Sequence, residues 1–244
     1  MTSQEFLFEK YLQLFNEKLV EYSPELPTDS DYNAVIVEPR IDPKILPIIR
    51  NHLYFLNESG SEKKWSLQVF HGTENQEFVY DILKDIKNIN YVNIGVKNFN
   101  KIEYNQYIKS NEFWSLVNGK KVLTFQLDTL LLRFGIDEFL KYDYIGAPWT
   151  KPKENKFIGN GGLSLRTRNV MLDISKNHKE YEPRWEDIFF VKWLTNKHEL
   201  PEISDAMKFS VENLFHHNPM GVHNPINISP YLLELLFEKS LTKL

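Results

Sequence analysis

Short apolar, β-branched runs alternate with segments of helical periodicity through the first half of this chain, and no other feature constrains the fold as strongly. Each run has the length and composition of a strand that is buried on both faces of a parallel sheet. The intervening segments place apolar residues at the spacing of one helix face. The predicted strands are Ala34–Glu38, Ser66–Phe70, Tyr91–Gly95 and Val122–Leu127. This order is typical of an open sheet covered by helices, so we predict an α/β fold with a mostly parallel central sheet.

The N-terminal segment is predicted to form a helix that precedes the main domain. Apolar side chains at helical spacing from residue 6 to residue 19 indicate an amphipathic helix, and the polar, proline-bearing SPELPTDSD ends it. We therefore divide the chain into a helix and link over residues 1–30 and one domain over residues 31–244. Within that domain we expect Asp42 to cap a helix with Pro43 at its first position, and one helix over residues 104–117.

Composition and charge exclude several classes of function. The 244 residues include no cysteine, which excludes disulfides, zinc–thiolate sites and thiol chemistry. The net charge of −4 and the pI near 6.0 give no general electrostatic reason to bind nucleic acid or an anionic membrane. The N-terminal MTSQEFLFEKYLQLF carries Glu5, Glu9 and Lys10, unlike a signal peptide or a membrane anchor. We expect a cytoplasmic protein with no membrane span and no nucleic-acid partner.

Polar side chains follow the predicted strands, and in open α/β sheets ligands bind beyond the carboxyl ends of the strands. Glu38 and Arg40 follow the first predicted strand, His71 follows the second, and Asp128 follows the fourth. The chain has neither the G-x-G-x-x-G fingerprint after its first strand nor a Walker A sequence. A divalent cation held by carboxylate and imidazole is a natural substitute for a glycine loop at a pyrophosphate. The sequence therefore favours a cation site near these strand ends.

A glycine cluster occurs in the second half of the chain. Gly159, Gly161 and Gly162 surround Asn160, and a backbone without Cβ atoms can approach a sugar ring closely. The Asn160 amide offers both a donor and an acceptor to sugar hydroxyls. A tight turn before the strand LSLR is the alternative reading of the glycines. Trp149, just ahead of the cluster, can stack on a sugar ring or pack in the core.

A pair of acids opens a segment that is apolar nearly all round. Glu186 and Asp187 precede the helical IFFVKWL, and the dipole and free N–H groups of a helix start stabilise an ionised carboxylate. Such a group is a competent base and a poor acid, which suits the deprotonation of an acceptor hydroxyl. Helix capping is the alternative and is compatible with that role. Adjacent carboxylates do not suit a two-acid glycosidase, whose carboxyl groups flank the bond at least about 5 Å apart.

The motifs FQLDTLLL, DYIGAPW, GNGGLSLR and EDIFF are followed by FSVE and PMGVHNP, within a region from about Ala34 to Ile226. This series resembles that of an uncharacterised glycosyltransferase-like family, itself similar to the nucleotide-sugar glycosyltransferases of the GT-A fold. The resemblance implies a single GT-A-like domain. It also implies metal-dependent transfer of a sugar from a nucleotide diphosphate donor, with a UDP-sugar favoured, to an acceptor hydroxyl. The partners would be the donor and a glycan, glycoprotein or small-molecule acceptor.

The resemblance also implies a metal site for Mn²⁺ or Mg²⁺. Gln126 and Asp128 lie where such enzymes carry the D-x-D motif, so Asp128 matches the metal-binding acid and Gln126 replaces the first acid. This replacement is compatible with weaker metal binding, with a contact between Gln126 and ribose, or with loss of metal dependence. Without the resemblance, Asp128 could equally cap a helix that starts at Thr129. His223 in PMGVHNP matches the late histidine that completes the metal site in many GT-A enzymes.

The resemblance further assigns the catalytic groups. In the family pattern the second acid of EDIFF is the usual base of inverting enzymes, so Asp187 is expected to be the general base and Glu186 to orient the acceptor. Apart from the resemblance, Arg40, Arg166 and Arg168 could each face phosphate, but solvated arginines are the default expectation. The predicted donor and acceptor site comprises Glu38, Arg40, Gln126, Trp149, Asn160, Gly161 and Gly162.

Two further classes of function stay open at this point. A catalytically silent protein that binds nucleotide-sugar or carbohydrate on the same fold would be compatible with Gln126, since fold does not fix function. A sugar nucleotidyltransferase shares the sheet and the cation, but it would be expected to carry a basic, glycine-rich loop after the first strand. The segment AVIVEPRIDP contains no such loop.

Overall fold

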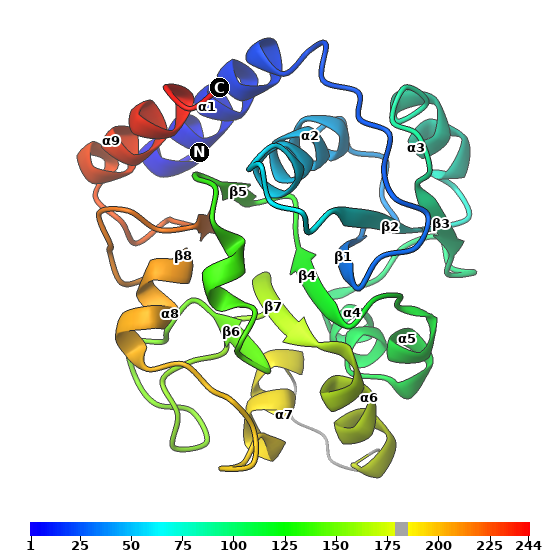
Figure 1. The fold of residues 1–244 in the computed structure, drawn as a ribbon, viewed down its shortest axis with the longest axis vertical. Helices are drawn as coiled ribbons and strands as arrows, with labels where there is room; N and C mark the ends of the chain where they lie inside the picture. The colour runs from blue at the N-terminus through cyan, green and yellow to red at the C-terminus, as the bar shows by residue number, and fades with distance from the viewer. Residues whose placement is uncertain (179–184) are drawn as a thin grey trace.

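A six-stranded sheet forms the centre of the computed structural model, which describes residues 1–178 and 185–244 (Figure 1). Parallel neighbours make up one side of this sheet, in the order β3 (Asn90–Asn93), β2 (Trp65–His71), β1 (Tyr32–Val37) and β4 (Lys121–Phe125). They coincide with the four apolar runs that the sequence indicated. The predicted α/β fold with a mostly parallel central sheet is therefore confirmed.

The other side of the sheet is antiparallel. β7 (Leu163–Thr167) pairs antiparallel with β4, and β6 (Tyr144–Gly146) pairs antiparallel with β7 and forms the edge. A second, three-stranded sheet has the order β5 (Thr129–Leu131), β9 (Gly221–His223) and β8 (Ser210–Val211). The long apolar run after residue 120 is thus divided between two sheets.

Helices cover both faces of the central sheet, because side chains alternate across each strand and both sets are apolar. Along β1, Ala34 and Ile36 belong to one apolar cluster and Val35 and Val37 to the other. The first cluster includes residues from the helices α1 (Ser3–Lys18), α2 (Ile45–Asn57), α3 (Gln76–Ile82), α8 (Ile203–Phe209) and α9 (Pro230–Leu241), and from the 3-10 helix η1 (Ile136–Phe139). The second includes residues from α4 (Lys101–Ile108), α5 (Asn111–Leu116), α6 (Arg168–Asn177) and α7 (Glu186–Trp193).

The first and last helices lie side by side (Figure 1). Tyr11 of α1 packs on Phe237 of α9 with ring centroids 5.1 Å apart, and Phe15 of α1 is fully buried. Tyr11 and Phe15 belong to the same apolar cluster as residues of α2. Across the described ranges, no helix is both long enough and apolar enough to span a bilayer.

Two local expectations and one alternative are corrected by the structure. Asp128 does not cap a helix, because Thr129 begins the strand β5. Asp42 does not cap α2 either: Lys44 occupies the N-cap position, and the Asp42 Oδ1 accepts from the Lys44 N–H in the turn before the helix. The predicted helix over residues 104–117 is interrupted, because the Ser110 side chain accepts from the Phe113 N–H and starts α5 as a separate helix.

Candidate functional site

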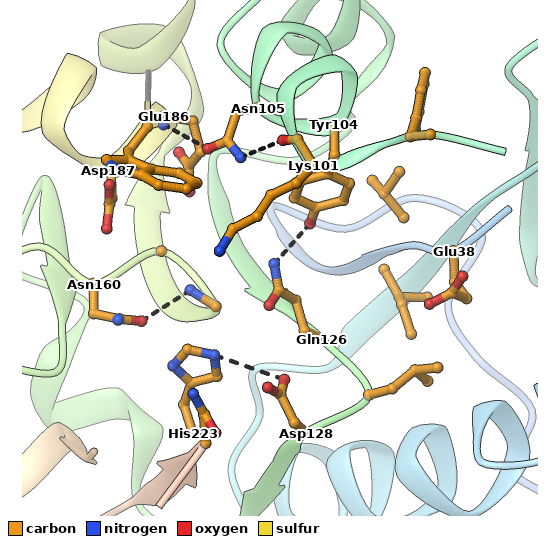
Figure 2. A pocket seen from close by; sticks show the side chains of 18 of the residues that line it. Glu38, Lys101, Tyr104, Asn105, Gln126, Asp128, Asn160, Glu186, Asp187 and His223 are labelled. Atoms are coloured by element: carbon orange, nitrogen blue, oxygen red, sulfur yellow. Dashed lines mark hydrogen bonds and ion pairs between the residues drawn. The ribbon is translucent and has the colours of Figure 1, made fainter. Parts of the chain in front are cut away.

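A cavity of about 750 Å³ opens at the carboxyl ends of β1 and β4 (Figure 2). Ligands of open α/β sheets bind at this edge. The walls come from these strand ends, from α4, from the glycine loop before β7, from the start of α7 and from the segment that follows β8 and β9. Nearly all of the predicted site residues line it: Glu38, Arg40, Gln126, Asp128, Asn160, Gly161, Gly162, Glu186, Asp187 and His223. The structure therefore brings these residues together around one pocket, and their roles stay predictions.

Asp128 and His223 meet because β5 and β9 pair antiparallel. The register sets Thr129 opposite His223, and the Asn224 N–H donates to the Asp128 carbonyl at 3.0 Å. This pairing leaves Asp128 Oδ1 3.6 Å from His223 Nε2 (Figure 2). The Asp128 side chain is half exposed, and the His223 side chain is 10% exposed. The strand pairing thus brings together the two residues predicted to hold a cation.

The donor atoms of this pair are compatible with one divalent cation. Ligands that each lie about 2.1 Å from an ion can be up to about 4.2 Å apart, and the observed separation is 3.6 Å. Burial lowers the pKa of His223, against the opposing effect of Asp128, so the imidazole is neutral as a metal ligand must be. Within the described part of the chain, no group of three acidic, histidine or cysteine side chains is arranged to hold a metal. Other oxygens, such as phosphate, would have to complete the coordination.

Gln126, which replaces the first acid of the D-x-D motif, is hydrogen-bonded to a side chain of α4. Gln126 Nε2 donates to the Tyr104 hydroxyl at 3.0 Å, and both side chains line the pocket. Figure 2 shows the Lys101 side chain, also from α4, extending into the same pocket. Its Nζ lies 4.4 Å from the centroid of the Trp185 ring. Lys101 was not among the predicted site residues. It reaches the pocket because α4 begins close to the strand ends, and the sequence does not show this placement.

The glycine loop is required by the protein's own side chains. A Cβ atom on Gly161 would overlap the carboxylate of Glu186, and one on Gly162 would overlap the imidazole of His223. From the sequence, these glycines were expected either to let a sugar ring approach the backbone or to form a tight turn. The structure gives them a second reason, since the loop backbone lies directly against two predicted site residues.

Glu186 is committed to a buried ion pair with Arg166. Both Glu186 oxygens accept from the guanidinium, at 2.8 and 2.9 Å, and Arg166 is fully buried, so its expected solvation is wrong. Arg166 Nε also donates to Ser164 Oγ at 2.8 Å, and the Glu186 N–H donates to Asn105 Oδ1 at 2.8 Å. These bonds fix the start of α7 against β7 and α4. Among the residues that the structure describes, Asp187 is the acid of the pair whose carboxylate forms no ion pair.

Asp187 has an environment opposite to the one expected from the sequence. A helix start was expected to favour the ionised carboxylate, but desolvation and the neighbouring Glu186 raise the pKa of Asp187 to about 6. The Ile188 N–H, Lys153 and Arg166 oppose this rise only in part. Desolvation dominates because the carboxylate is partly enclosed beside a second acid. The group is therefore a stronger base than an ordinary aspartate.

Glu212 is a further acid of the pocket that the sequence analysis did not identify. It follows β8 and lines the cavity, and its side chain is 13% exposed. Burial, Asp187 and Asp128 raise the pKa of Glu212 to about 7, with Lys153 acting in the opposite direction. The only signal in the sequence was its place as the last residue of FSVE within the motif series.

Three other predicted residues, Glu38, Arg40 and Trp149, make contacts with other side chains of the protein. Glu38 binds the Arg40 guanidinium through both oxygens, at 2.7 and 2.6 Å, so the two form a pair on the pocket wall. Trp149 is 4% exposed, belongs to the apolar layer and does not line the cavity. The Lys153 Nζ covers its ring at 4.3 Å. The expected stacking of Trp149 on a sugar is therefore not supported by its position.

Solved structures of similar fold are glycosyltransferases. Mouse xyloside xylosyltransferase 1 matches at 8% identity and a TM-score of 0.50, over 83% of this chain and 100% of that chain. The bifunctional glycosyltransferase WbbM matches at 11% identity and a TM-score of 0.50, over 83% and 47%. GlyE of Streptococcus pneumoniae TIGR4 matches at 12% identity and a TM-score of 0.49, over 86% of this chain, which spans 60% of the length of GlyE. At these identities the likeness concerns the fold, which is GT-A-like.

The family described as "Protein of unknown function (DUF5672)" matches residues 88–223, more than half of the chain. This protein is a member of that family. The matched segment begins just before β3 and ends at His223, so it contains the strand end with Asp128, the glycine loop and both acids of α7. A comparison with curated proteins found no match.

Proposed function

We propose that this protein is a glycosyltransferase that moves a sugar from a nucleoside diphosphate donor to an acceptor hydroxyl. The observation that carries the proposal is the 3.6 Å approach of Asp128 Oδ1 to His223 Nε2 in the pocket that also contains Asp187. The GT-A-like fold supports the same conclusion. A UDP-sugar is the favoured donor, and a glycan, glycoprotein or small molecule would supply the acceptor hydroxyl.

Asp128 and His223 are the residues that would hold Mn²⁺ or Mg²⁺. When bound, such a cation supplies positive charge that stabilises the departing diphosphate. Gln126 contributes no charge, so the site has one carboxylate where a D-x-D sequence has two. Lys101 extends into the pocket and offers a second positive charge to the phosphates (Figure 2). The diphosphate is thus expected near the ends of β4 and α4.

Asp187 is proposed as the general base. With a pKa of about 6 the carboxylate is mostly ionised at neutral pH and remains basic enough to accept a proton. As the acceptor oxygen bonds to the anomeric carbon, its proton passes to Asp187. The bond from that carbon to the diphosphate oxygen breaks, and the nucleoside diphosphate leaves with the electron pair. A single displacement of this kind inverts the anomeric centre.

Glu186 supports this chemistry indirectly. The sequence analysis expected it to orient the acceptor, but both of its oxygens are bonded to Arg166. We propose that the pair holds the first turn of α7 in place and thereby fixes the direction of the adjacent Asp187 carboxylate. Positioning of a catalytic group on a packed helix keeps it aligned with the substrates.

The proposal is tested by thermal-shift screening of nucleoside diphosphates with and without Mn²⁺, followed by an assay of donor hydrolysis. We expect one nucleoside diphosphate to stabilise the protein more strongly with Mn²⁺ than without it, and Asp128→Asn to abolish that difference. Lys84→Met, which removes an exposed ion pair between Lys84 and Asp81 of α3, serves as the control. A protein that neither binds nor hydrolyses any nucleotide-sugar contradicts the proposal.

A silent binding protein is the second candidate, and the uncharged Gln126 held by Tyr104 favours it. Binding of a nucleotide-sugar without hydrolysis or transfer, under every acceptor and metal condition tried, would support this candidate. Preference for a nucleoside triphosphate together with a sugar phosphate would instead indicate a nucleotidyltransferase.

A further inference from the structure

The carboxylate of Glu212 lies between two predicted site residues. Its Oε2 accepts from Asn160 Nδ2 at 2.8 Å, and its Oε1 is 3.8 Å from His223 Nδ1. The proposed transfer reaction gives Glu212 no role, although the side chain is largely buried inside the pocket. A buried carboxylate that bridges two site residues constrains the hydrogen bonds that both can make.

The direction of these hydrogen bonds is set by the main chain. The Gly162 N–H donates to Asn160 Oδ1 at 3.0 Å. Since a backbone N–H can only donate, the Asn160 amide must present its oxygen to Gly162 and its nitrogen to Glu212. An ionised carboxylate can only accept. Each bond therefore runs the same way along the chain, from Gly162 to Asn160 and from Asn160 to Glu212.

The two nitrogens of the His223 ring have different surroundings. Nδ1 is buried and makes no hydrogen bond with any residue that the structure describes, and the Glu212 Oε1 faces it. Nε2 faces Asp128, whose side chain is 48% exposed and open to water. The ring also packs against Gly162, where a Cβ atom would overlap it.

We propose that Glu212 is a positioning residue that keeps the proton of His223 on Nδ1. The Nδ1–H then points towards the Glu212 carboxylate, 3.8 Å away, and the lone pair of Nε2 is directed towards Asp128 and the pocket. A histidine that binds a metal through one nitrogen commonly donates its other N–H to a carboxylate, which fixes the tautomer. The part of this inference that concerns a cation rests on the proposed function, whereas the hydrogen-bond order does not.

The substitution Glu212→Gln tests this order because it changes one acceptor into a donor. An amide offers one oxygen and one NH₂ group, and the Asn160 nitrogen requires the oxygen. The NH₂ group would then face His223 Nδ1, which must accept, so the ring proton moves to Nε2. Asn160 cannot turn round to avoid this without leaving the Gly162 N–H without its acceptor. Asp205→Asn is the matched control, a partly buried carboxylate of α8 that bonds Tyr142 and Lys208.

The decisive measurement is the tautomer of His223 in the metal-free protein. Long-range ¹H–¹⁵N correlation of histidine-labelled protein at mildly alkaline pH, assigned by loss of the signal in His223→Asn, should give the Nδ1–H form in the wild type. The same form is expected in Asp205→Asn, and the Nε2–H form should dominate in Glu212→Gln. The Nε2–H form in the wild type, or an unchanged tautomer in a folded Glu212→Gln variant, overturns the proposal.

A metal titration then separates this inference from the proposed function. Mn²⁺ affinity, measured by electron paramagnetic resonance without donor, should be about 10–100-fold weaker in Glu212→Gln than in the wild type. If His223→Asn abolishes Mn²⁺ binding but Glu212→Gln binds Mn²⁺ as tightly as the wild type, Glu212 does not act on the cation site through His223. If the wild type binds no Mn²⁺ at all, the cation part of the proposed function fails, and the measured tautomer alone decides whether Glu212 orients His223.

Discussion

Replacement of Arg166 by methionine should strongly destabilise this protein. Arg166 is fully buried, and its guanidinium donates to both Glu186 carboxylate oxygens. Methionine fills much of the same space but leaves the Glu186 carboxylate buried without a positive partner. The ring centroids of Trp114, Tyr144 and Phe190 lie 4.8 to 5.7 Å from the Arg166 guanidinium carbon, so little water can replace it.

The expected loss of stability follows from the burial of the unpaired Glu186 carboxylate. Removal of one partner of a buried ion pair costs about 3–5 kcal/mol, compared with a total of about 5–15 kcal/mol for a typical domain. For a domain of this size each kcal/mol lowers Tm by about 2–4 °C, so Arg166→Met should lower Tm by about 6–20 °C. The double variant Arg166→Met/Glu186→Leu should recover most of this loss, because an apolar pair leaves no unpaired charge.

Calorimetry or urea unfolding of the two single variants and the double variant gives the coupling energy directly. Lys97→Met is the control, because the Lys97–Glu74 pair has a short contact of 2.6 Å but is exposed. It should leave Tm unchanged. An Arg166→Met variant whose Tm stays within about 3 °C of the wild type, or a double variant no more stable than Arg166→Met, would refute the reasoning.

Three further predictions concern the pocket. Asp187→Asn should lower turnover by about 10²–10⁴-fold while the donor Kd stays nearly constant, and near-normal turnover or a product of retained configuration would count against it. In the wild type, kcat should rise with pH through about 6, because the base form of Asp187 exists only above its raised pKa; a profile without this acid limb contradicts the assignment, as does a limb that persists in Asp187→Asn. Gly162→Ala should weaken Mn²⁺ binding, because the added methyl group displaces the His223 imidazole, and an unchanged affinity in the folded variant would contradict the described packing.

The parallel half of the fold was predictable because burial on both faces leaves a continuous apolar run. β1 and β4 therefore appear in the sequence without ambiguity, and the residues beyond their ends, Glu38 and Asp128, were located by the same reasoning. The acids of α7 were found because the helix is apolar nearly all round and begins with charge. These features are local, and a short window of sequence contains them.

The second sheet was not predictable, because its strands are too short to show a period. β8 has two residues and β9 has three, so neither alternation nor a turn signal marks them. Glu212 enters the pocket only through the parallel pairing of β8 with β9. For the same reason nothing in the sequence indicated that Thr129 starts the strand β5.

The burial of Arg166 could have been inferred with one more step. Ser164 and Arg166 alternate with Leu163 and Leu165 along β7, and all four are buried. A charged residue within a strand that is covered on both faces requires an opposite charge nearby. Its partner, Glu186, had instead been assigned to the substrate because the resemblance concerned only the order of the motifs.

The pairing of β9 with β5 also has a consequence for the order of folding. The parallel strands are joined by short local crossovers, whereas His223 reaches Asp128 only when segments that are far apart in the chain come together. Contacts of this kind close a long loop. They form late, because the chain loses the entropy of loop closure before the contacts can stabilise it. A folding intermediate with an intact parallel sheet would therefore carry Asp128 without its histidine. Acquisition of cation affinity during refolding would then mark the final docking of the C-terminal segment, after the bulk of the secondary structure has formed.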